Sequence, residues 1–399
     1  MAIDPAAVLD AAADIEWAAA AAPDHARAQW MLGTLRHAQG SFDEALTAFE
    51  QAADLDPMPW RATTGRNDAL RRAADQRGTP VADLQAIFRA ASPGSSVGWE
   101  LMDDHVHPSV EGHALLARGI VQSMTQLSGD VRVDPAVEAD LPGPDVYLER
   151  LGDNIFDRFG VAARMRALFN VPLFKETNPW AFELMNDRVA SLEAQMSEAQ
   201  QASALEWLQP QVNQQYSRAL SGRIGKQMVI TGDLASAERL FTAAERSINP
   251  YTDRAIEYAY LKFGSRAKLA GTLTPEVRAG VEDALLRADI MLRNSASHEP
   301  VLHRFSGELL QMLGRHEEAL RHLGTARQSD RYRGRERVDL EMQLLESLLA
   351  TGRRQDALAL IDNGIANAGP FSPIYVAQRA RVLDSGGQTP PDEAGPRTP

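Results

Sequence analysis

The chain of 399 residues has no cysteine, few aromatic side chains and no long hydrophobic run. Without cysteine it forms neither disulfides nor thiolate metal sites, which fits a reducing compartment. Because no run of about 18 consecutive apolar residues occurs, we expect no membrane-spanning helix. Acidic residues outnumber lysine and arginine by 54 to 41, and the formal net charge is −13. This average charge repels nucleic-acid backbones and anionic membranes, so we expect neither as the main partner.

The N-terminal stretch also lacks the features of a secretory signal. Four acidic residues, Asp4, Asp10, Asp14 and Glu16, lie where such a signal has positive charge and an unbroken apolar run. We therefore expect a cytoplasmic location, with the alternative that an export signal lies upstream of Met1.

A recurring pattern of small residues is the clearest positive feature of the chain. Residues 26–59 contain Gly33, Gly40, Ala45, Phe49 and Pro57. In this interpretation Gly33 and Ala45 let two antiparallel helices approach, Gly40 permits the turn between them, and Phe49 fills the groove toward the next unit. Pro57 then follows the second helix, which it cannot continue.

The same frame recurs three times further along the chain. It is found at Gly225, Gly232, Ala237, Phe241, Ala244 and Pro250, at Gly307, Gly314, Ala319, Leu323 and Ala326, and more loosely at Gly352, Ala357, Ile361 and Pro370. The pattern resembles the tetratricopeptide repeat. That resemblance implies an α-solenoid of stacked helical hairpins that holds a protein or peptide on its concave face. The alternative is a plain bundle of helical hairpins.

Residues 60–127 follow a different pattern. We predict a helix over 66–77, a short strand over 79–84, a helical turn over 86–91, a loop, and a helix over 110–126. Asn67 is expected near the start of the first of these helices. This order is typical of the last part of a parallel α/β sandwich.

The loop before the last of these helices contains Asp104-x-x-His107-Pro108. The order of Asn67, the segment 81–84, Gly98-Trp99-Glu100-Leu101 and this motif resembles the C-terminal end of SGNH (GDSL-type) hydrolase domains. The resemblance implies that His107 is a general base and that Asp104 orients its imidazole.

The nucleophile that such a pair requires is missing. No Gly-Asp-Ser occurs in the chain, and Ser96 and Ser109 lie in loops without the strand-to-helix setting that fixes a nucleophile. The predicted strand also has no partner, because residues 1–60 are helical in pattern. Three explanations remain open for this unpaired strand. The segment packs on helices as an irregular extended stretch, it pairs with another chain, or the sequence is a truncated form of a longer protein. We favour the last explanation.

Two further clusters have alternative interpretations. Six potential metal ligands lie close together in the sequence: Asp103, Asp104, His105, His107, Glu111 and His113. We favour the interpretation without a metal, in which His107 is a vestigial base. The run Arg331-Tyr332-Arg333-Gly334-Arg335 is either a patch for an acidic ligand or, as we favour, a solvated connector between helices.

The predicted fold class is mainly α, a tetratricopeptide-like α-solenoid with a small truncated α/β segment near the N-terminus. The expected domains are a helix plus one repeat (1–59), a hydrolase-like remnant (60–127), a linker (128–148), a repeat domain (149–383) and a disordered tail (384–399). The predicted function is a protein-interaction scaffold without cofactor or metal. The alternative is an SGNH-type ester hydrolase or acyltransferase whose serine lies upstream or in another chain.

Overall fold

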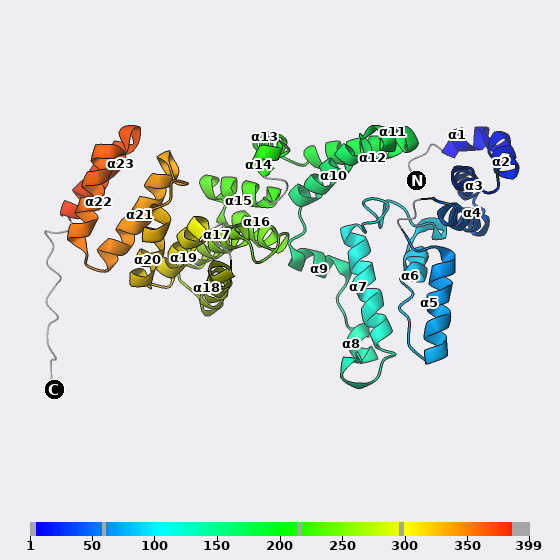
Figure 1. Cartoon of the computed structure of the whole chain (residues 1–399), viewed down its shortest axis with the longest axis horizontal. Coiled ribbons are helices and arrows are strands. Elements are labelled where there is room, and N and C mark those ends of the chain that lie inside the picture. Colours follow the sequence, from blue (N-terminus) through cyan, green and yellow to red (C-terminus); the bar gives the residue numbers. More distant parts are fainter. Residues whose placement is uncertain (1–4, 58–60, 214–217, 295–298, 385–399) are drawn as a thin grey trace. The chain divides into compact units, whose positions relative to one another are not determined.

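The structure is a computed structural model that describes residues 5–57, 61–213, 218–294 and 299–384. The chain divides into two compact units, residues 1–204 and 205–399 (Figure 1). Within the described ranges the secondary structure is helical, and an isolated bridge between Met102 and Pro108 is the one β feature. The mainly α fold class is therefore confirmed.

Unit 1 begins with short helices and continues through the segment that carries the Asp104 loop. Its helices are α1 (Pro5–Asp10), α2 (Ala12–Ala21), α3 (Ala26–Ala38), α4 (Phe42–Asp54), α5 (Thr64–Arg77), α6 (Leu84–Ala91), η1 (Pro93–Ser95), α7 (Val110–Met124), η2 (Gly129–Val131), α8 (Pro135–Ala139), α9 (Pro144–Leu151), α10 (Ile155–Phe169), α11 (Pro172–Thr177) and α12 (Pro179–Glu193). Helix α13 (Glu198–Trp207) spans the boundary between the units.

Unit 2 is a succession of longer helices. They are α14 (Pro210–Asn213), α15 (Leu220–Thr231), α16 (Leu234–Arg246), α17 (Asp253–Ala270), α18 (Pro275–Asn294), α19 (Glu299–Met312), α20 (His316–Arg327), α21 (Gly334–Ala350), α22 (Arg354–Asn367), η3 (Gly369–Phe371) and α23 (Ser372–Asp384). Of the expected disordered tail, Asp384 ends α23, and residues 385–399 lie outside the described residues.

The predicted frame forms four helical hairpins, α3–α4, α15–α16, α19–α20 and α21–α22. Each turn contains a glycine with positive φ, between 72° and 84°, at Gly40, Gly232, Gly314 and Gly352. The residue after each glycine donates its backbone N–H to the carbonyl five residues earlier, over 2.8–2.9 Å. This is the hydrogen bond of a Schellman motif, which ends a helix and starts the reversal.

Close helix approach depends on a second small residue. A Cβ atom on Gly33 would lie 2.6 Å from the Phe49 ring, and one on Gly225 would lie 2.8 Å from the Phe241 ring. In α19–α20 the same relation holds between Gly307 and Leu323, at 2.5 Å. Phe49 was expected to fill the groove toward the next unit, but its ring lies against Gly33 within its own hairpin.

The strand predicted over residues 79–84 is wrong. Residues 79–83 are irregular, and α6 already begins at Leu84. Pro80 has no N–H to donate to a sheet, and Asp83 caps α6 by accepting a hydrogen bond from the backbone N–H of Ala86 at 3.0 Å. The helices predicted on either side are confirmed as α5, α6 and α7.

Consequently, the small α/β segment expected at 60–127 is not found among the described residues, which exclude Trp60. The stretch expected as a linker, 128–148, contains η2, α8 and the start of α9. In the portion of the chain that is described, no helix is both long and apolar enough to span a bilayer.

Candidate functional site

The structure brings the two residues of the Asp-x-x-His motif together. The Asp104 Oδ2 atom lies 2.7 Å from the Nδ1 atom of His107, and Asp104 Oδ1 accepts the backbone N–H groups of Val106 and His107, both at 2.6 Å. The Asp104 side chain is buried, whereas that of His107 is 75% exposed. Burial raises the pKa of the Asp104 carboxyl, but the hydrogen bonds from His107 and Val106 outweigh it and hold this pKa below its ordinary value.

The loop that carries this pair is fastened to α7. Backbone hydrogen bonds join Asp103 N to His107 O at 2.9 Å and Ser109 N to Leu101 O at 2.8 Å. A Cβ atom on Gly112 would lie 2.2 Å from the Leu101 carbonyl oxygen, so only glycine fits there. Asp104 therefore has a structural role, because its carboxylate stabilises the loop by accepting the backbone N–H groups of Val106 and His107.

The two loop serines are engaged by backbone groups. The Ser109 hydroxyl donates to the Glu100 carbonyl at 3.3 Å and accepts from the Gly112 N–H at 3.1 Å, which caps α7. The Ser96 hydroxyl donates to the Gly94 carbonyl at 3.3 Å. Among the described residues, therefore, neither Ser96 nor Ser109 is hydrogen-bonded to His107.

Three of the six potential metal ligands around this loop contact other partners. Asp103 lies 3.5 Å from Arg188, Glu111 lies 2.8 Å from Arg158, and His113 Nδ1 lies 3.0 Å from the Ser109 carbonyl oxygen. In the described parts of the chain, no group of three or more acidic or histidine side chains is arranged to hold a metal ion.

A second cluster of polar side chains, which the sequence analysis missed, lies in unit 2. Glu257 on α17 is buried and forms ion pairs with Lys226 on α15 and, at 2.5 Å, with Arg254 on its own helix. On α19, Glu308 is buried and forms an ion pair with Arg304 at 2.9 Å. Three successive first helices of the hairpins therefore contribute to one charged surface.

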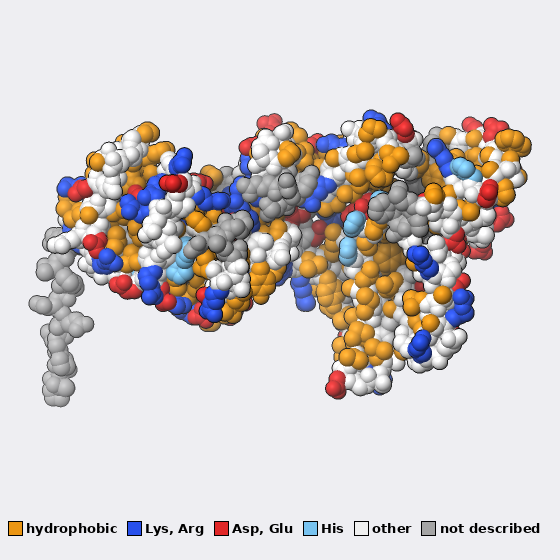
Figure 2. Space-filling view, viewed as in Figure 1, with side chains coloured by type: hydrophobic (Ala, Val, Ile, Leu, Met, Phe, Trp, Pro, Cys, Tyr) orange, Lys and Arg blue, Asp and Glu red, His pale blue; other side chains and the backbone are white. Residues whose placement is uncertain are grey.

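Like charges meet at the same surface. Arg218 is partly buried, and burial followed by the nearby charges of Arg254 and Arg331 lowers the pKa of its guanidinium. The Arg218 Nε atom is buried and has no hydrogen-bond partner in the part of the chain that the structure describes. Figure 2 shows lysine and arginine atoms gathered over this part of unit 2. We call the set Arg218, Lys226, Arg254, Arg304 and Arg331 the cationic face.

The aromatic ring of Tyr332 belongs to the same surface. The Arg304 guanidinium lies 5.5 Å from the centre of that ring, which is a cation–π contact, and the Tyr332 hydroxyl donates to the Pro300 carbonyl at 3.2 Å. Burial raises the pKa of Tyr332 to about 12 although Arg304 and Arg331 lower it. Tyr332 was predicted to lie in a solvated connector, yet it is buried, so the connector interpretation fails for this residue.

A further buried carboxylate repeats the arrangement on α21. Glu341 accepts hydrogen bonds from Arg327 at 2.8 Å, from Arg337 at 2.9 Å and from the Tyr375 hydroxyl at 2.6 Å. Burial raises the pKa of Glu341, but these donors outweigh it and lower the pKa overall. The sequence does contain a signal for these pairs, because an arginine precedes each buried glutamate by three or four residues on α17, α19 and α21.

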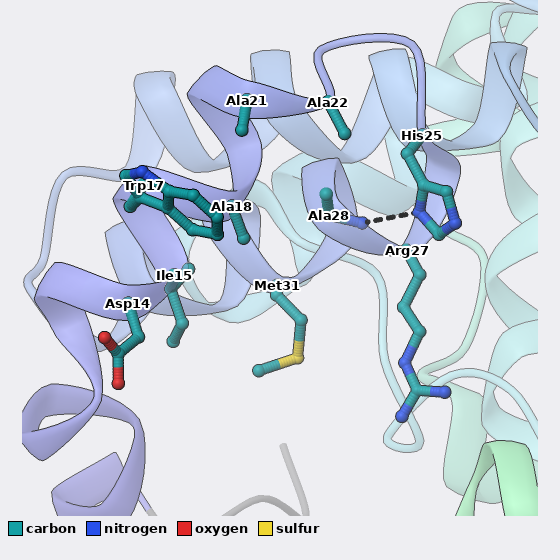
Figure 3. A pocket seen from close by; sticks show the side chains of 10 residues that line it. All are labelled: Asp14, Ile15, Trp17, Ala18, Ala21, Ala22, His25, Arg27, Ala28 and Met31. Atoms are coloured by element: carbon teal, nitrogen blue, oxygen red, sulfur yellow. Dashed lines mark hydrogen bonds between the residues drawn. The ribbon is translucent and has the colours of Figure 1, made fainter.

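Unit 1 has an apolar groove beside its first hairpin (Figure 3). It is lined by residues of α2 and α3, among them Trp17, Ala18, Ala21 and Met31. The Trp17 side chain is largely exposed.

The fold and these surfaces define a helical-hairpin repeat chain. The tetratricopeptide repeat family matches residues 26–51 and 300–325, which are the α3–α4 and α19–α20 hairpins. The repeat prediction is confirmed at these two hairpins, one in each unit. Neither matched segment falls within residues 60–127, where the hydrolase resemblance stays a prediction.

Over its whole length the chain has little similarity to known proteins. No curated protein matches it significantly. Among solved structures, the crystal structure of yeast Tom70 is 14% identical and covers 94% of this chain and 88% of its own, with a TM-score of 0.22. A TM-score this low supports no conclusion about fold or function.

Proposed function

We propose that the chain is a protein-interaction scaffold and that the first helices of the unit 2 hairpins hold a peptide segment of a partner. The observation that carries this proposal is that α15, α17 and α19 jointly present partly exposed polar side chains at one surface. Stacked hairpins present equivalent helices side by side, and such surfaces accommodate extended chains. The family match to α19–α20 supports the same assignment.

Ion pairs give this surface a fixed shape. The side chains of Arg254 and Arg304 are only 13% and 20% exposed, and each is held by a buried glutamate. A guanidinium held in this way loses little further side-chain entropy when it binds a ligand. The guanidinium groups of this surface are therefore preorganised for ligand binding.

The test is a selection of random displayed peptides on the full-length chain, followed by photocrosslinking. We expect enrichment of related peptides that compete with one another and crosslink to a benzophenone amino acid placed at position 226. Position 321 on α20 provides the control, because the side chain of Arg321 is 76% exposed and lies on a second helix. No enrichment, or crosslinking at 321 but not at 226, would contradict the proposal.

A second function is favoured by one observation, the hydrogen bond between Asp104 and His107. It is the orientation that an SGNH-type ester hydrolase or acyltransferase needs, with the serine supplied by upstream sequence or another chain. Turnover of a p-nitrophenyl ester that is lost in His107→Ala would support this function. Turnover unchanged by His107→Ala would contradict it.

A further inference from the structure

We propose that the α19–α20 hairpin binds a divalent transition-metal ion between His303 and His322, with Ni²⁺ or Cu²⁺ preferred over Zn²⁺. His303 lies on the first helix of this hairpin and His322 on the second. Their Nδ1 atoms are 3.0 Å apart, and their ring centres are 4.9 Å apart. Metal binding at this place is independent of the peptide binding proposed above.

The separation of the two Nδ1 atoms suits one ion that both rings coordinate. Imidazole nitrogens bind zinc over about 2.0–2.1 Å, and with bonds of this length two nitrogens 3.0 Å apart subtend an angle of about 91–97° at the ion. That angle is close to the right angle between neighbouring ligands of a square-planar or tetragonal ion. It is narrower than the tetrahedral angle of about 109° in structural zinc sites. The geometry therefore favours Ni²⁺ or Cu²⁺, for which imidazole is also a suitable ligand.

Both imidazoles must be neutral to coordinate an ion. Burial, the neighbouring His303 and Arg321 lower the pKa of His322 below its ordinary value of 6.5, so protons do not compete with a metal for this ring at neutral pH. Without an ion, one of the two Nδ1 atoms donates its hydrogen to the other. When an ion binds, the donating ring takes the tautomer with its hydrogen on Nε2, and the pair loses no proton.

Water completes the coordination of the ion. Within the described ranges, no third acidic or histidine side chain forms a metal-binding group with this pair. Asp289 and Glu318 act on the pKa of His322, but Asp289 forms an ion pair with Arg293 and Glu318 forms one with Arg315. Both histidines are half-buried, and Figure 2 shows histidine atoms at the surface of unit 2 where α19 and α20 lie, so water reaches the site.

An ion held in this way links the two helices of one hairpin. The two histidines are 19 residues apart in the sequence, and the folded hairpin brings their rings together. Because the unfolded chain does not hold them at this distance, the free energy of metal binding stabilises the folded hairpin.

The test is isothermal titration calorimetry of the full-length chain, without a histidine tag, with Ni²⁺ and with Zn²⁺. His303→Ala and His322→Ala each remove one ligand. His316→Ala is the matched control, because His316 also lies on α20 but its Nδ1 atom is 3.4 Å from the Ser347 hydroxyl oxygen. His107→Ala reports on metal binding in the loop of unit 1, and circular dichroism confirms that the variants are folded.

We expect one Ni²⁺ site, which binds Ni²⁺ more tightly than Zn²⁺. The loss of a direct ligand should cost at least as much affinity as the loss of an outer-shell partner, about 10–100-fold, whereas His316→Ala should change the affinity by less than about twofold. Ni²⁺ binding that is unchanged in His322→Ala or lost in His107→Ala would overturn the proposal. Tighter binding of Zn²⁺ than of Ni²⁺ would contradict the angle at the ion.

A spectroscopic measurement tests the site without altering either ligand. Electron paramagnetic resonance of the His107→Ala chain with one equivalent of Cu²⁺ should show hyperfine coupling to two nitrogen atoms, one from each imidazole. Coupling to a single nitrogen, or to none, would exclude coordination by the His303–His322 pair.

Discussion

Two buried glutamates of the same charged surface have pKa values shifted in opposite directions. Burial raises the pKa of Glu257, but Lys226 and Arg254 outweigh it and lower this pKa overall. Burial also raises the pKa of Glu308, and the pKa stays raised because Arg304 and the Tyr260 hydroxyl do not compensate for burial and Glu257 repels the carboxylate. The number of cations around each carboxylate decides the direction of its shift.

Glu257→Gln should destabilise the protein by about 3 kcal/mol near neutral pH, because Lys226 and Arg254 lose their common partner. The folded pKa of Glu257 lies below its ordinary value of 4.5, so its contribution is present above pH 4.5 and is lost as the pH falls through the folded pKa. Urea unfolding at several pH values measures this. A difference between wild type and variant that stays constant down to strongly acidic pH would contradict the assignment.

Glu308→Gln should show the opposite pH dependence. The folded pKa of Glu308 lies above 4.5, so its contribution to stability is full below pH 4.5 and is lost as the pH rises through the folded pKa. The variant should therefore gain stability relative to wild type as the pH rises, by about 1.4 kcal/mol per unit of pKa shift. The same urea titrations check this, and a relative loss of stability with rising pH would exclude it.

Asp104 and His107 should differ in what their removal does to the fold. Asp104→Ala leaves the backbone donors of Val106 and His107 without their acceptor, and we expect a loss of about 2 kcal/mol in the free energy of unfolding. His107→Ala removes an exposed ring together with one hydrogen bond to Asp104 Oδ2, and should cost less than Asp104→Ala, about 1 kcal/mol. Equal losses in the two variants would show that Asp104 does not hold the loop.

At the scale of the element, the hairpins depend on glycines that face an aromatic or aliphatic side chain. Gly225→Ala places a methyl group 2.8 Å from the Phe241 ring and should destabilise the protein by about 1–3 kcal/mol. Gly264→Ala on α17 is the matched control, since nothing lies within 4 Å of its Cβ position, and it should stabilise by about 0.5–1 kcal/mol. Thermal melting of both variants measures the difference, and equal melting temperatures would refute this packing account.

The glycine frame was predictable from sequence because turn glycines and small residues recur at fixed spacing within about 25 residues. The Asp104–His107 contact was also anticipated, since three residues separate them in one tight loop. The strand predicted at 79–84 was wrong. The apolar alternation in this segment is weak, and Asp83 instead caps the helix that begins at Leu84. The cationic face could not be predicted, since Lys226, Arg254 and Arg304 come from three separate helices and meet only through hairpin stacking.

At the scale of the whole molecule, the two units of the chain should behave as separate folding units. Trp207 is buried in unit 2, where its Nε1–H donates to the Arg218 carbonyl at 2.8 Å. A fragment of residues 198–399, which retains all of α13, should melt cooperatively and bind a display-selected peptide as the full chain does. Circular dichroism and anisotropy test this, and a fragment that lacks helical structure would contradict independent folding.

The domain boundaries expected from sequence, with breaks at 59, 127, 148 and 383, stay a prediction. The contact-based division falls at residue 204, within the stretch that was expected to be one repeat domain. Within the segment 128–148, which was expected to be a linker, Glu138 on α8 lies 3.9 Å from Arg118 on α7.

The most direct test of the central claim is hydrogen–deuterium exchange of the full-length chain with and without a bound, display-selected peptide. A peptide held by the first helices of unit 2 should slow exchange in α15, α17 and α19, and leave the loop around Asp104 unchanged. Protection confined to unit 1, or none at saturating peptide, would contradict the account.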